Sequence, residues 1–412
     1  MNLRIEAGRA VGTVTAPPSK SMAHRLLISA AMADGKAVLS GVSKCEDVLA
    51  TVDCLRVLGS DCQMDGDTVT VTGADLSKPP KGTLILPCRE SGSTIRFLLP
   101  IACLSGREVT LCGAPSLLKR PMKVYEELCR AHGMCFSQTD KGITVKGPLQ
   151  AGTYTLAGNV SSQFVSGMLF ALTQTAGESI IKLIPPVESR SYILLTVSAL
   201  CEFGAQVEWL DDTTLRVEGG VPMKAHDATV EGDYSNAAFL EAFNLFEGDV
   251  KVGGLQEDSL QGDRVYRDCF QHLVTDPETP ISLRDCPDLA PILFSLAAAK
   301  KGGYFTDTKR LKIKESDRAE VMAQELRKFG TRVIVEENSV RVIADAFHAP
   351  DALLYGHNDH RVVMSLAVLA SVTGGEIDGC EAVTKSYPAF FSDLRRLGIR
   401  LEEIDRKGTE TL

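Results

Sequence analysis

Lysine, arginine and hydroxyl side chains occur together where the sequence predicts that a helix begins. The stretch PPSKSMAHR places Lys20, Ser21 and Arg25 at such a start. A helix N-terminus exposes unpaired backbone N–H groups and carries a partial positive charge, so it favours anions. Because two full positive charges are added there, these residues predict a site for a small molecule that carries phosphate or carboxylate groups.

Two further helix starts in the first half of the chain carry similar donors. In ESGSTIRF, the polar residues SGST directly follow Glu90. NVSSQF contains Ser161, Ser162 and Gln163. Any one of these serines could be an ordinary helix cap. Three such starts in one half, each with donors beyond the cap, favour a ligand site over capping alone.

A second group of cations lies mainly in the later half of the chain. LKRP contains Arg120, KESDR contains Lys314 and Arg318, NDHR ends in Arg361, and VTKSYP contains Lys385. A charge run is usually a solvated face. If residues 309–318 form a helix, however, Lys314 and Arg318 share one face, and that arrangement favours an anion held between them.

Two carboxylates stand among these cations. Asp288 lies at the start of an apolar helix pattern in CPDLAP, and Glu315 lies between Lys314 and Arg318. Each can either balance neighbouring positive charge or exchange a proton with a substrate. The sequence leaves both readings open.

Other kinds of chemistry find little support in the motifs. There is no Walker A loop, no G-x-S-x-G and no dinucleotide-binding fingerprint. The 12 cysteines form no C-x-x-C pair. His357 and His360 could ligate a metal, but no complete set of ligands at a recognised metal-site spacing surrounds them in the sequence, so we expect no metal.

Composition narrows the class of protein. A net charge of −9 argues against a general nucleic-acid partner. The first residues, MNLRIEAGRA, lack the apolar core of a signal peptide, and no apolar run is long enough to span a bilayer. We therefore expect a soluble cytoplasmic protein with reduced thiols and no membrane partner.

A repeated unit has to position these residues. Each copy begins with a polar turn that runs into a small apolar helix pattern, and a second helix pattern and an alternating hairpin pattern follow. The six copies begin at Ser19, Glu90, Asn159, Gly232, Cys286 and His357. The fourth copy lacks the helix-ending glycine and is weaker. One copy cannot bury its apolar helix alone, so we expect the copies to pack together.

The six copies divide into two groups of three. We expect an N-terminal domain over residues 19–226 and a C-terminal domain over residues 1–18 plus 227–412. The second domain would be discontinuous because the first segment, LRIEAGRAVGTVTA, could pair as a strand with the later half.

Seven motifs in the same order resemble those of the 5-enolpyruvylshikimate-3-phosphate (EPSP) synthase family. They are PPSKSMAHR, SGSTIRF, LKRP, NVSSQF, KESDR, NDHR and VTKSYP, and they span nearly the whole chain. The resemblance implies an α/β (α+β) fold with two similar domains. Each domain would have three βαβαββ units packed around buried helices, with an active-site cleft between the domains. It also implies a monomer without metal or organic cofactor.

The resemblance further implies a reaction and a set of site residues. The 5-hydroxyl of shikimate 3-phosphate would attack C2 of phosphoenolpyruvate while C3 is protonated, and the adduct would lose phosphate. Proton transfer would fall to Asp288 and Glu315, with Lys20 as a third catalytic residue. Shikimate 3-phosphate would be held by Lys20, Ser21, Arg25, Ser161, Ser162, Gln163, Ser189, Tyr192, Asp288 and Lys314. Phosphoenolpyruvate would be held by Lys20, Gly92, Arg120, Gln163, Arg318, Arg361 and Lys385.

Two positions depart from the family pattern. Glu90 and Arg310 stand where many relatives carry asparagine. An acidic group beside an anionic substrate needs a cationic partner, for which Arg89 and Arg120 are the candidates. The contacts made from positions 90 and 310 are therefore open.

Two other functions compete with this interpretation. UDP-N-acetylglucosamine enolpyruvyl transferase shares the architecture, but it typically has Lys-Asn in place of Lys20-Ser21 and a cysteine before the loop arginine. Here GAPSLLKRP contains no cysteine. A non-catalytic protein that binds a phosphate-bearing ligand is the other alternative, and Asp288 and Glu315 argue against it.

Overall fold

The chain folds into two compact units, each with its own hydrophobic core. The structure is a computed structural model, and it describes residues 1–404. One unit spans Pro18–Glu231, and the other, discontinuous unit combines Met1–Pro17 with the chain from Gly232 onward. The boundary lies a few residues after the predicted one at residue 227, because residues 228–229 pair with a strand of the 18–231 unit.

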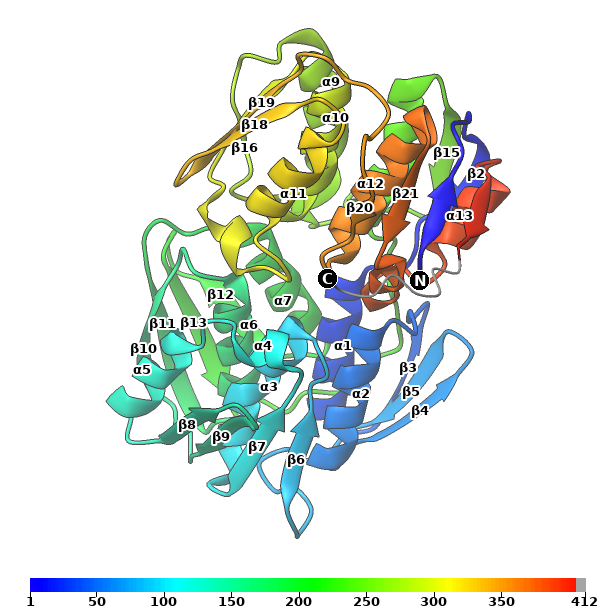
Figure 1. Ribbon diagram of the computed structural model, residues 1–412. Coiled ribbons are helices and arrows are strands. Elements are labelled where there is room, and N and C mark those ends of the chain that lie inside the picture. The colour runs from blue at the N-terminus through cyan, green and yellow to red at the C-terminus, as the bar shows by residue number, and fades with distance from the viewer. Residues whose placement is uncertain (405–412) are drawn as a thin grey trace. The chain divides into compact units, whose positions relative to one another are not determined.

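The 18–231 unit repeats one order of elements three times: strand, buried helix, parallel strand, second helix and antiparallel hairpin (Figure 1). The first copy has α1 (Lys20–Met32), β3 (Lys36–Ser40), α2 (Glu46–Leu58), β4 (Asp61–Asp65) and β5 (Thr68–Thr72). The second has β6 (Leu84–Pro87), α3 (Gly92–Ala102), β7 (Glu108–Cys112), α5 (Lys123–Ala131), β8 (Cys135–Thr139) and β9 (Gly142–Lys146). The third has β10 (Thr153–Ala157), α6 (Ser162–Leu172), β11 (Gly177–Ile184), α7 (Arg190–Glu202), β12 (Gln206–Trp209) and β13 (Thr214–Gly219).

Two short helices and one late strand complete this unit. The 3₁₀ helix η1 (Cys103–Ser105) follows α3, and α4 (Pro115–Leu118) precedes α5. The first copy has no strand before α1, and β14 (Ala228–Thr229) takes that place by pairing parallel to β3. Each copy therefore contains one four-stranded sheet. The strand orders of the three sheets are β14-β3-β5-β4, β6-β7-β9-β8 and β10-β11-β13-β12.

Apolar composition explains why the sheets lie outside and three helices lie inside this unit. Most residues of α1, α3 and α6 are buried around the whole helix. A helix that is apolar on all sides must be covered on all sides, and the three sheets surround this group (Figure 1). Serine caps start all three: the hydroxyls of Ser19, Ser91 and Ser161 accept hydrogen bonds from first-turn backbone N–H groups.

The discontinuous unit contains one complete copy and two modified ones. The complete copy has β16 (Ile281–Ser282), α10 (Ala290–Ala299), β17 (Gly303–Thr306), α11 (Arg318–Arg327), β18 (Arg332–Val335) and β19 (Ser339–Ile343). The last copy has β20 (Leu354–Tyr355), α12 (His360–Thr373), β21 (Gly375–Asp378), α13 (Phe390–Arg396) and β22 (Leu401–Glu403). The fourth has β2 (Val11–Thr15), α8 (Tyr234–Glu241), β15 (Asp249–Gly253) and α9 (Tyr266–Thr275). Short 3₁₀ helices join these elements: η2 (Ala242–Phe246), η3 (Gly262–Val265), η4 (Pro287–Leu289), η5 (Lys309–Ile313) and η6 (Cys380–Lys385).

The N-terminal segment supplies strands to both modified copies. β1 (Leu3–Ile5) lies between β21 and β22 and pairs antiparallel with both, and β2 pairs parallel with β15. The fourth copy, which the sequence marks as weaker, has no hairpin after α9 in the described residues. The predicted fold class, with two domains of repeated helix-and-hairpin units, is confirmed.

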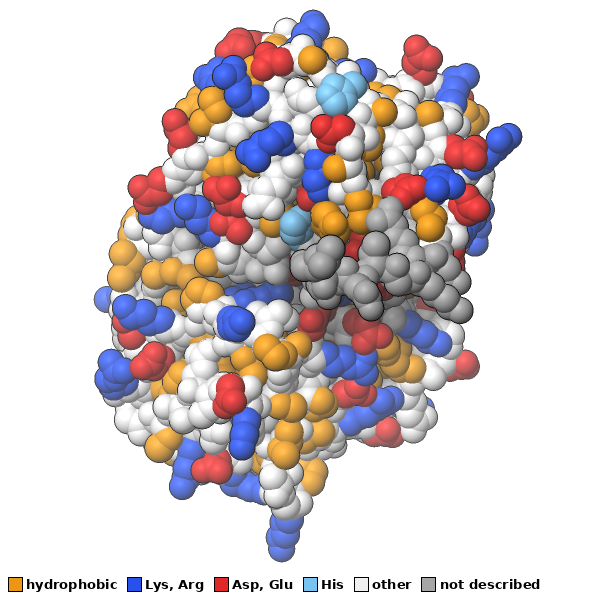
Figure 2. Space-filling model, viewed as in Figure 1, with side chains coloured by type: hydrophobic (Ala, Val, Ile, Leu, Met, Phe, Trp, Pro, Cys, Tyr) orange, Lys and Arg blue, Asp and Glu red, His pale blue; other side chains and the backbone are white. Residues whose placement is uncertain are grey.

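The net charge of −9 is spread over a surface that also carries many basic side chains. Acidic and basic side chains are interspersed on the face shown in Figure 2.

No helix within residues 1–404 combines the length and the apolar character needed to cross a membrane.

Candidate active site

The predicted site residues fall into two sets, one in each unit. The 18–231 unit holds Lys20, Ser21, Arg25, Gly92, Arg120, Ser161, Ser162, Gln163, Ser189 and Tyr192. The discontinuous unit holds Asp288, Lys314, Glu315, Arg318, Arg361 and Lys385. Each set is described in its own unit below.

Lys20 is the first residue of α1 and forms an ion pair with the start of α2. Its Nζ lies 2.9 Å from Oδ2 of Asp47, and both side chains are largely buried. The sequence analysis missed Asp47. The available signal was an acidic residue in the first turn of the next helix, which is also an ordinary stabilising feature.

Arg25 is buried and brings α1 and α7 together. Nε donates to Thr196 Oγ1 at 2.8 Å, Nη1 to the Ser21 carbonyl at 2.6 Å and Nη2 to the Tyr192 carbonyl at 2.9 Å. Burial lowers the pKa of Arg25 to about 10, so the guanidinium is still charged at neutral pH. Three predicted residues, Ser21, Arg25 and Tyr192, therefore meet in one place.

Gln163 joins the starts of α3 and α6. Its Nε2 donates to Ser93 Oγ at 2.9 Å, and its Oε1 accepts from Arg96 Nη1 at 2.7 Å. Ser161 caps α6 by accepting from the Gln163 backbone N–H at 3.3 Å. Arg96 is a further cation at this position that the sequence analysis missed, because it stands inside an apolar helix pattern.

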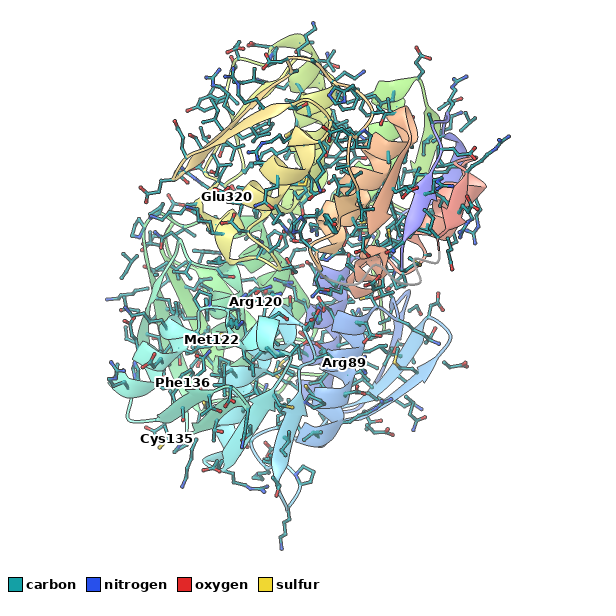
Figure 3. All side chains as sticks on the ribbon, in the orientation of Figure 1. Arg89, Arg120, Met122, Cys135, Phe136 and Glu320 are labelled. Carbon is teal, nitrogen blue, oxygen red and sulfur yellow. The ribbon has the colours of Figure 1, made fainter. Side chains whose placement is uncertain are left out.

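Gly92 lets an arginine approach the first turn of α3. A Cβ added at this glycine would lie 2.6 Å from Arg120 Nη1, closer than real Cβ contacts allow. Figure 3 labels Arg120, which follows α4 and lies beside it. The absent side chain at position 92 is therefore what allows the guanidinium to approach the helix start.

Two predicted serines lie at helix starts of the third copy. Ser162 is the first residue of α6, and Ser189 immediately precedes α7; both are buried. Ser189 has φ 53°, a left-handed conformation that costs energy for a residue with a side chain. Such strain is characteristic of positions that a functional site constrains.

Glu90 and Arg89 have separate partners. Glu90 Oε1 accepts from Ser116 Oγ at 3.1 Å. Arg89, labelled in Figure 3, pairs with two carboxylates of α2, at 2.5 Å from Glu46 and 2.6 Å from Asp53. Arg89 is thus an anchor between the second copy and α2 and does not serve as the cation for Glu90.

In the discontinuous unit, Asp288 lies among three cations. Its Oδ1 accepts from Arg318 Nη1 at 2.7 Å and from Lys314 Nζ at 3.2 Å, and its Oδ2 accepts from Arg361 Nη2 at 3.1 Å. Burial alone would raise the pKa of Asp288, but the charges of Arg361, Lys314 and Arg318 outweigh it and hold the pKa well below its usual range. Asp288 is therefore ionised at neutral pH.

Arg318 is the centre of this cluster and is almost wholly buried. Besides Asp288, its Nη2 lies 2.6 Å from Glu315 Oε2 and its Nε lies 2.9 Å from Asp359 Oδ2. Burial opposes the charge, yet Asp359, Glu315 and Asp288 together raise the pKa of Arg318 above its ordinary value. The sequence analysis missed Asp359, which also accepts from the Arg361 backbone N–H at 3.0 Å and caps α12.

The prediction that Lys314 and Arg318 share a helix face is wrong. Residues 309–313 form the 3₁₀ helix η5, Lys314 is extended, and α11 begins only at Arg318. The two cations nevertheless share a partner, because both pair with Oδ1 of Asp288. Arg310 lies in η5 and donates to the Arg284 carbonyl at 2.6 Å.

A strained turn leads into α12 and contacts Lys385. His357 and Asn358 both have left-handed φ angles, 49° and 53°. The Asn358 carbonyl accepts from Lys385 Nζ at 2.7 Å, and His357 Nε2 lies 2.9 Å from Oε1 of the buried Glu325. These contacts fix the turn that carries Asp359 and Arg361.

The arrangement can bind anions and move protons. Several cations and helix starts can balance phosphate and carboxylate charge, and Asp288 and Glu315 can exchange protons with a bound molecule. Within residues 1–404, no cluster of three or more histidine, cysteine or acidic side chains is placed to bind a metal ion.

Comparisons with known proteins agree with this chemistry. The family described as "EPSP synthase (3-phosphoshikimate 1-carboxyvinyltransferase)" matches residues 6–394. The 3-phosphoshikimate 1-carboxyvinyltransferase of Clostridium kluyveri is 34% identical over 420 residues, which cover 95% of this chain and 96% of that protein. The enzyme of the same name from Clostridium botulinum (strain Eklund 17B) is 33% identical, with 97% and 98% covered.

Solved structures of similar fold have lower identity. The EPSP synthase from Acinetobacter baumannii has a TM-score of 0.79 and 23% identity, with 98% of this chain and 100% of that chain covered. The enolpyruvyl transferase NikO from Streptomyces tendae has a TM-score of 0.79 and 18% identity, with 97% and 98% covered. These likenesses show the fold.

Proposed function

The chain belongs to the EPSP synthase family, and on this premise we propose that it transfers the enolpyruvyl group of phosphoenolpyruvate to the 5-hydroxyl of shikimate 3-phosphate. The products are 5-enolpyruvylshikimate 3-phosphate and phosphate, and the step belongs to the biosynthesis of chorismate and the aromatic amino acids. The observation that carries the proposal is the charge network in which one ionised carboxylate, Asp288, is held by three cations.

The reaction has to neutralise negative charge and make three proton transfers. The 5-hydroxyl loses a proton as its oxygen adds to C2 of phosphoenolpyruvate, and C3 gains a proton. The tetrahedral adduct then loses phosphate and a proton from C3. Asp288 and Glu315 accept and return these protons, since both carboxylates contact Arg318, whose charge balances the change.

Each substrate is held by its own group of cations, and Lys20 belongs to both groups. Lys20, Arg120, Arg318, Arg361 and Lys385 hold phosphoenolpyruvate, with Gly92 and Gln163. Arg25 and Lys314 hold shikimate 3-phosphate together with Ser21, Ser161, Ser162, Ser189, Tyr192, Gln163, Asp288 and Lys20. Fixed donors aimed at developing charge are worth more than flexible ones, because they need no rearrangement during the reaction. We expect the enzyme to act as a cytoplasmic monomer.

Phosphate release tests the proposal directly. Purified protein mixed with shikimate 3-phosphate and phosphoenolpyruvate should release phosphate only when both are present, and mass spectrometry should show the enol ether. Lys20→Met should abolish most turnover and keep the circular dichroism of the wild type. Lys44→Met, at an exposed lysine of the same unit, is the matched control and should keep full activity.

Two results would overturn the proposal. Phosphate release with UDP-N-acetylglucosamine in place of shikimate 3-phosphate would assign the chain to the other enolpyruvyl transfer. Binding of both proposed substrates without turnover would make it a binding protein.

A further inference from the structure

A chain of buried polar side chains links the N-terminal halves of α1, α2 and α3. His24 Nδ1 lies 2.7 Å from Thr51 Oγ1, Thr51 Oγ1 lies 2.7 Å from Thr94 Oγ1, and Thr94 Oγ1 donates to Ser91 Oγ at 2.7 Å. All four residues have 0% exposure. Polar groups without any access to water are costly unless their hydrogen bonds are made, so this chain is a specific feature of the unit.

The donors along the chain have one consistent direction. The Thr94 hydroxyl donates its single proton either to Ser91 Oγ or to the Asp47 carbonyl, which lies 3.3 Å away. Thr51 must then donate to Thr94 and accept from His24. His24 therefore carries a proton on Nδ1, and its Nε2 has no hydrogen-bond partner within residues 1–404. Burial and the nearby charges of Lys20 and Arg25 lower the pKa of His24 well below its ordinary value, in agreement with a neutral ring.

The chain also reaches the partner of Lys20. The Asp47 backbone carbonyl, the alternative acceptor for the Thr94 proton, lies 3.3 Å from Thr94 Oγ1, and the Asp47 carboxylate pairs with Lys20 at 2.9 Å. Lys20 lies one helical turn before His24 on α1. The other branch ends on Ser91, whose hydroxyl caps α3 beside Gly92.

We propose that the His24–Thr51–Thr94 chain is a positioning element that holds Lys20 and the α3 start at Gly92 in one fixed geometry for phosphoenolpyruvate. The inference rests on the proposed function, because it assigns the ligand of Lys20 and Gly92. A chain that only stabilised the core would affect unfolding and leave substrate affinity unchanged. If the chain is a positioning element, removing one of its hydrogen bonds must also change the Michaelis constant.

The decisive comparison uses two variants of Thr51 and one control. Thr51→Val keeps the shape of the side chain and removes the hydroxyl from the middle of the chain, whereas Thr51→Ser keeps the hydroxyl. Thr173→Val is the matched control, because Thr173 is a buried threonine of the same unit whose hydroxyl donates to the Phe170 carbonyl at 2.8 Å. All three should keep the circular dichroism of the wild type.

We expect Thr51→Val to raise the KM for phosphoenolpyruvate by roughly five-fold, the equivalent of about one hydrogen bond. Thr51→Ser should restore most of the affinity, and Thr173→Val should lower the melting temperature without changing KM. An unchanged KM in Thr51→Val, with the same loss of stability as the control, would overturn the proposal.

A second measurement does not depend on turnover. Ring nitrogen shifts from NMR of ¹⁵N-histidine-labelled protein, assigned with His24→Gln, should show the Nδ1–H form of His24 in the wild type. The same signals should shift in Thr51→Val and stay in Thr173→Val. A proton on Nε2, or no response to Thr51→Val, would refute the chain itself, whereas a wild type without turnover would refute the proposed function.

Discussion

Replacing Asp359 with asparagine tests how the buried centre of the charge network is held. The Asp359 carboxylate has 0% exposure and accepts from Arg318 Nε at 2.9 Å, from Ser316 Oγ at 3.0 Å and from the Arg361 backbone N–H at 3.0 Å. An asparagine of the same shape keeps one oxygen and turns the other position into a donor. It therefore cannot accept hydrogen bonds from both Arg318 Nε and the Arg361 backbone N–H at the start of α12.

The expected loss of stability depends on which carboxylates still pair with Arg318 in the variant. Removing one partner of a buried ion pair costs about 3–5 kcal/mol, and losing one charge-assisted hydrogen bond costs about 1.5–3 kcal/mol. Glu315 at 2.6 Å and Asp288 at 2.7 Å still balance the guanidinium, so the lower range applies. We expect a loss of about 2 kcal/mol, which lowers Tm by about 4–8 °C for a unit of this size.

Activity should fall for a separate reason. Either Arg318 Nε loses its acceptor or the start of α12, which carries Arg361, loses its cap, so a group that we assign to phosphoenolpyruvate shifts. A small displacement of substrate-positioning groups can cost a large factor in rate, and we expect KM for phosphoenolpyruvate to rise at least about ten-fold. Calorimetry and steady-state kinetics with phosphoenolpyruvate varied measure the two effects.

Asp393→Asn is the matched control for this experiment. Asp393 is buried in α13 and accepts from Tyr387 Oη at 2.7 Å and Arg396 Nη1 at 2.9 Å, and we assign it no role in binding. This variant should lose stability at an unchanged KM. If Asp359→Asn also left KM unchanged, Asp359 would be a structural residue only; if its Tm did not fall, the buried ion pair would not stabilise the unit.

Two further predictions concern the helix start of α3 and the dependence on pH. Gly92→Ala should raise KM for phosphoenolpyruvate, because the new Cβ would displace Arg120, whereas Gly152→Ala, where a Cβ meets nothing within 4 Å, should match the wild type in kinetic assays. The lowered pKa of Asp288 stabilises the fold fully above the unfolded pKa of about 3.9, and this contribution is lost as pH falls through the lower folded value. The difference in Tm between wild type and Asp288→Asn should therefore be constant from about pH 8 to 5 and shrink below about pH 4, and a difference independent of pH down to about pH 2 would contradict the network.

Local physics made much of the fold predictable. A polar capping residue followed by an apolar run marks a buried helix, and α1, α3, α6, α8 and α12 all begin in this way, whereas α10 continues from the 3₁₀ helix η4 without a side-chain cap. The weaker fourth copy was also visible, because a missing glycine and missing alternation are local properties of its sequence. Cations and hydroxyls at helix starts likewise identified most of the candidate site.

Only the tertiary structure decided which residues complete and hold these elements. β14 has two residues, too few for a sequence pattern, and it is a strand because the distant β3 supplies its hydrogen bonds. Asp47 looks like an ordinary first-turn acid and Asp359 like an ordinary N-cap, yet packing places them against Lys20 and Arg318. The sequence by itself determined where helices start and which charges they carry. Long-range packing decided which charges meet, because an ion pair depends on distance in space, which spacing along the chain does not determine.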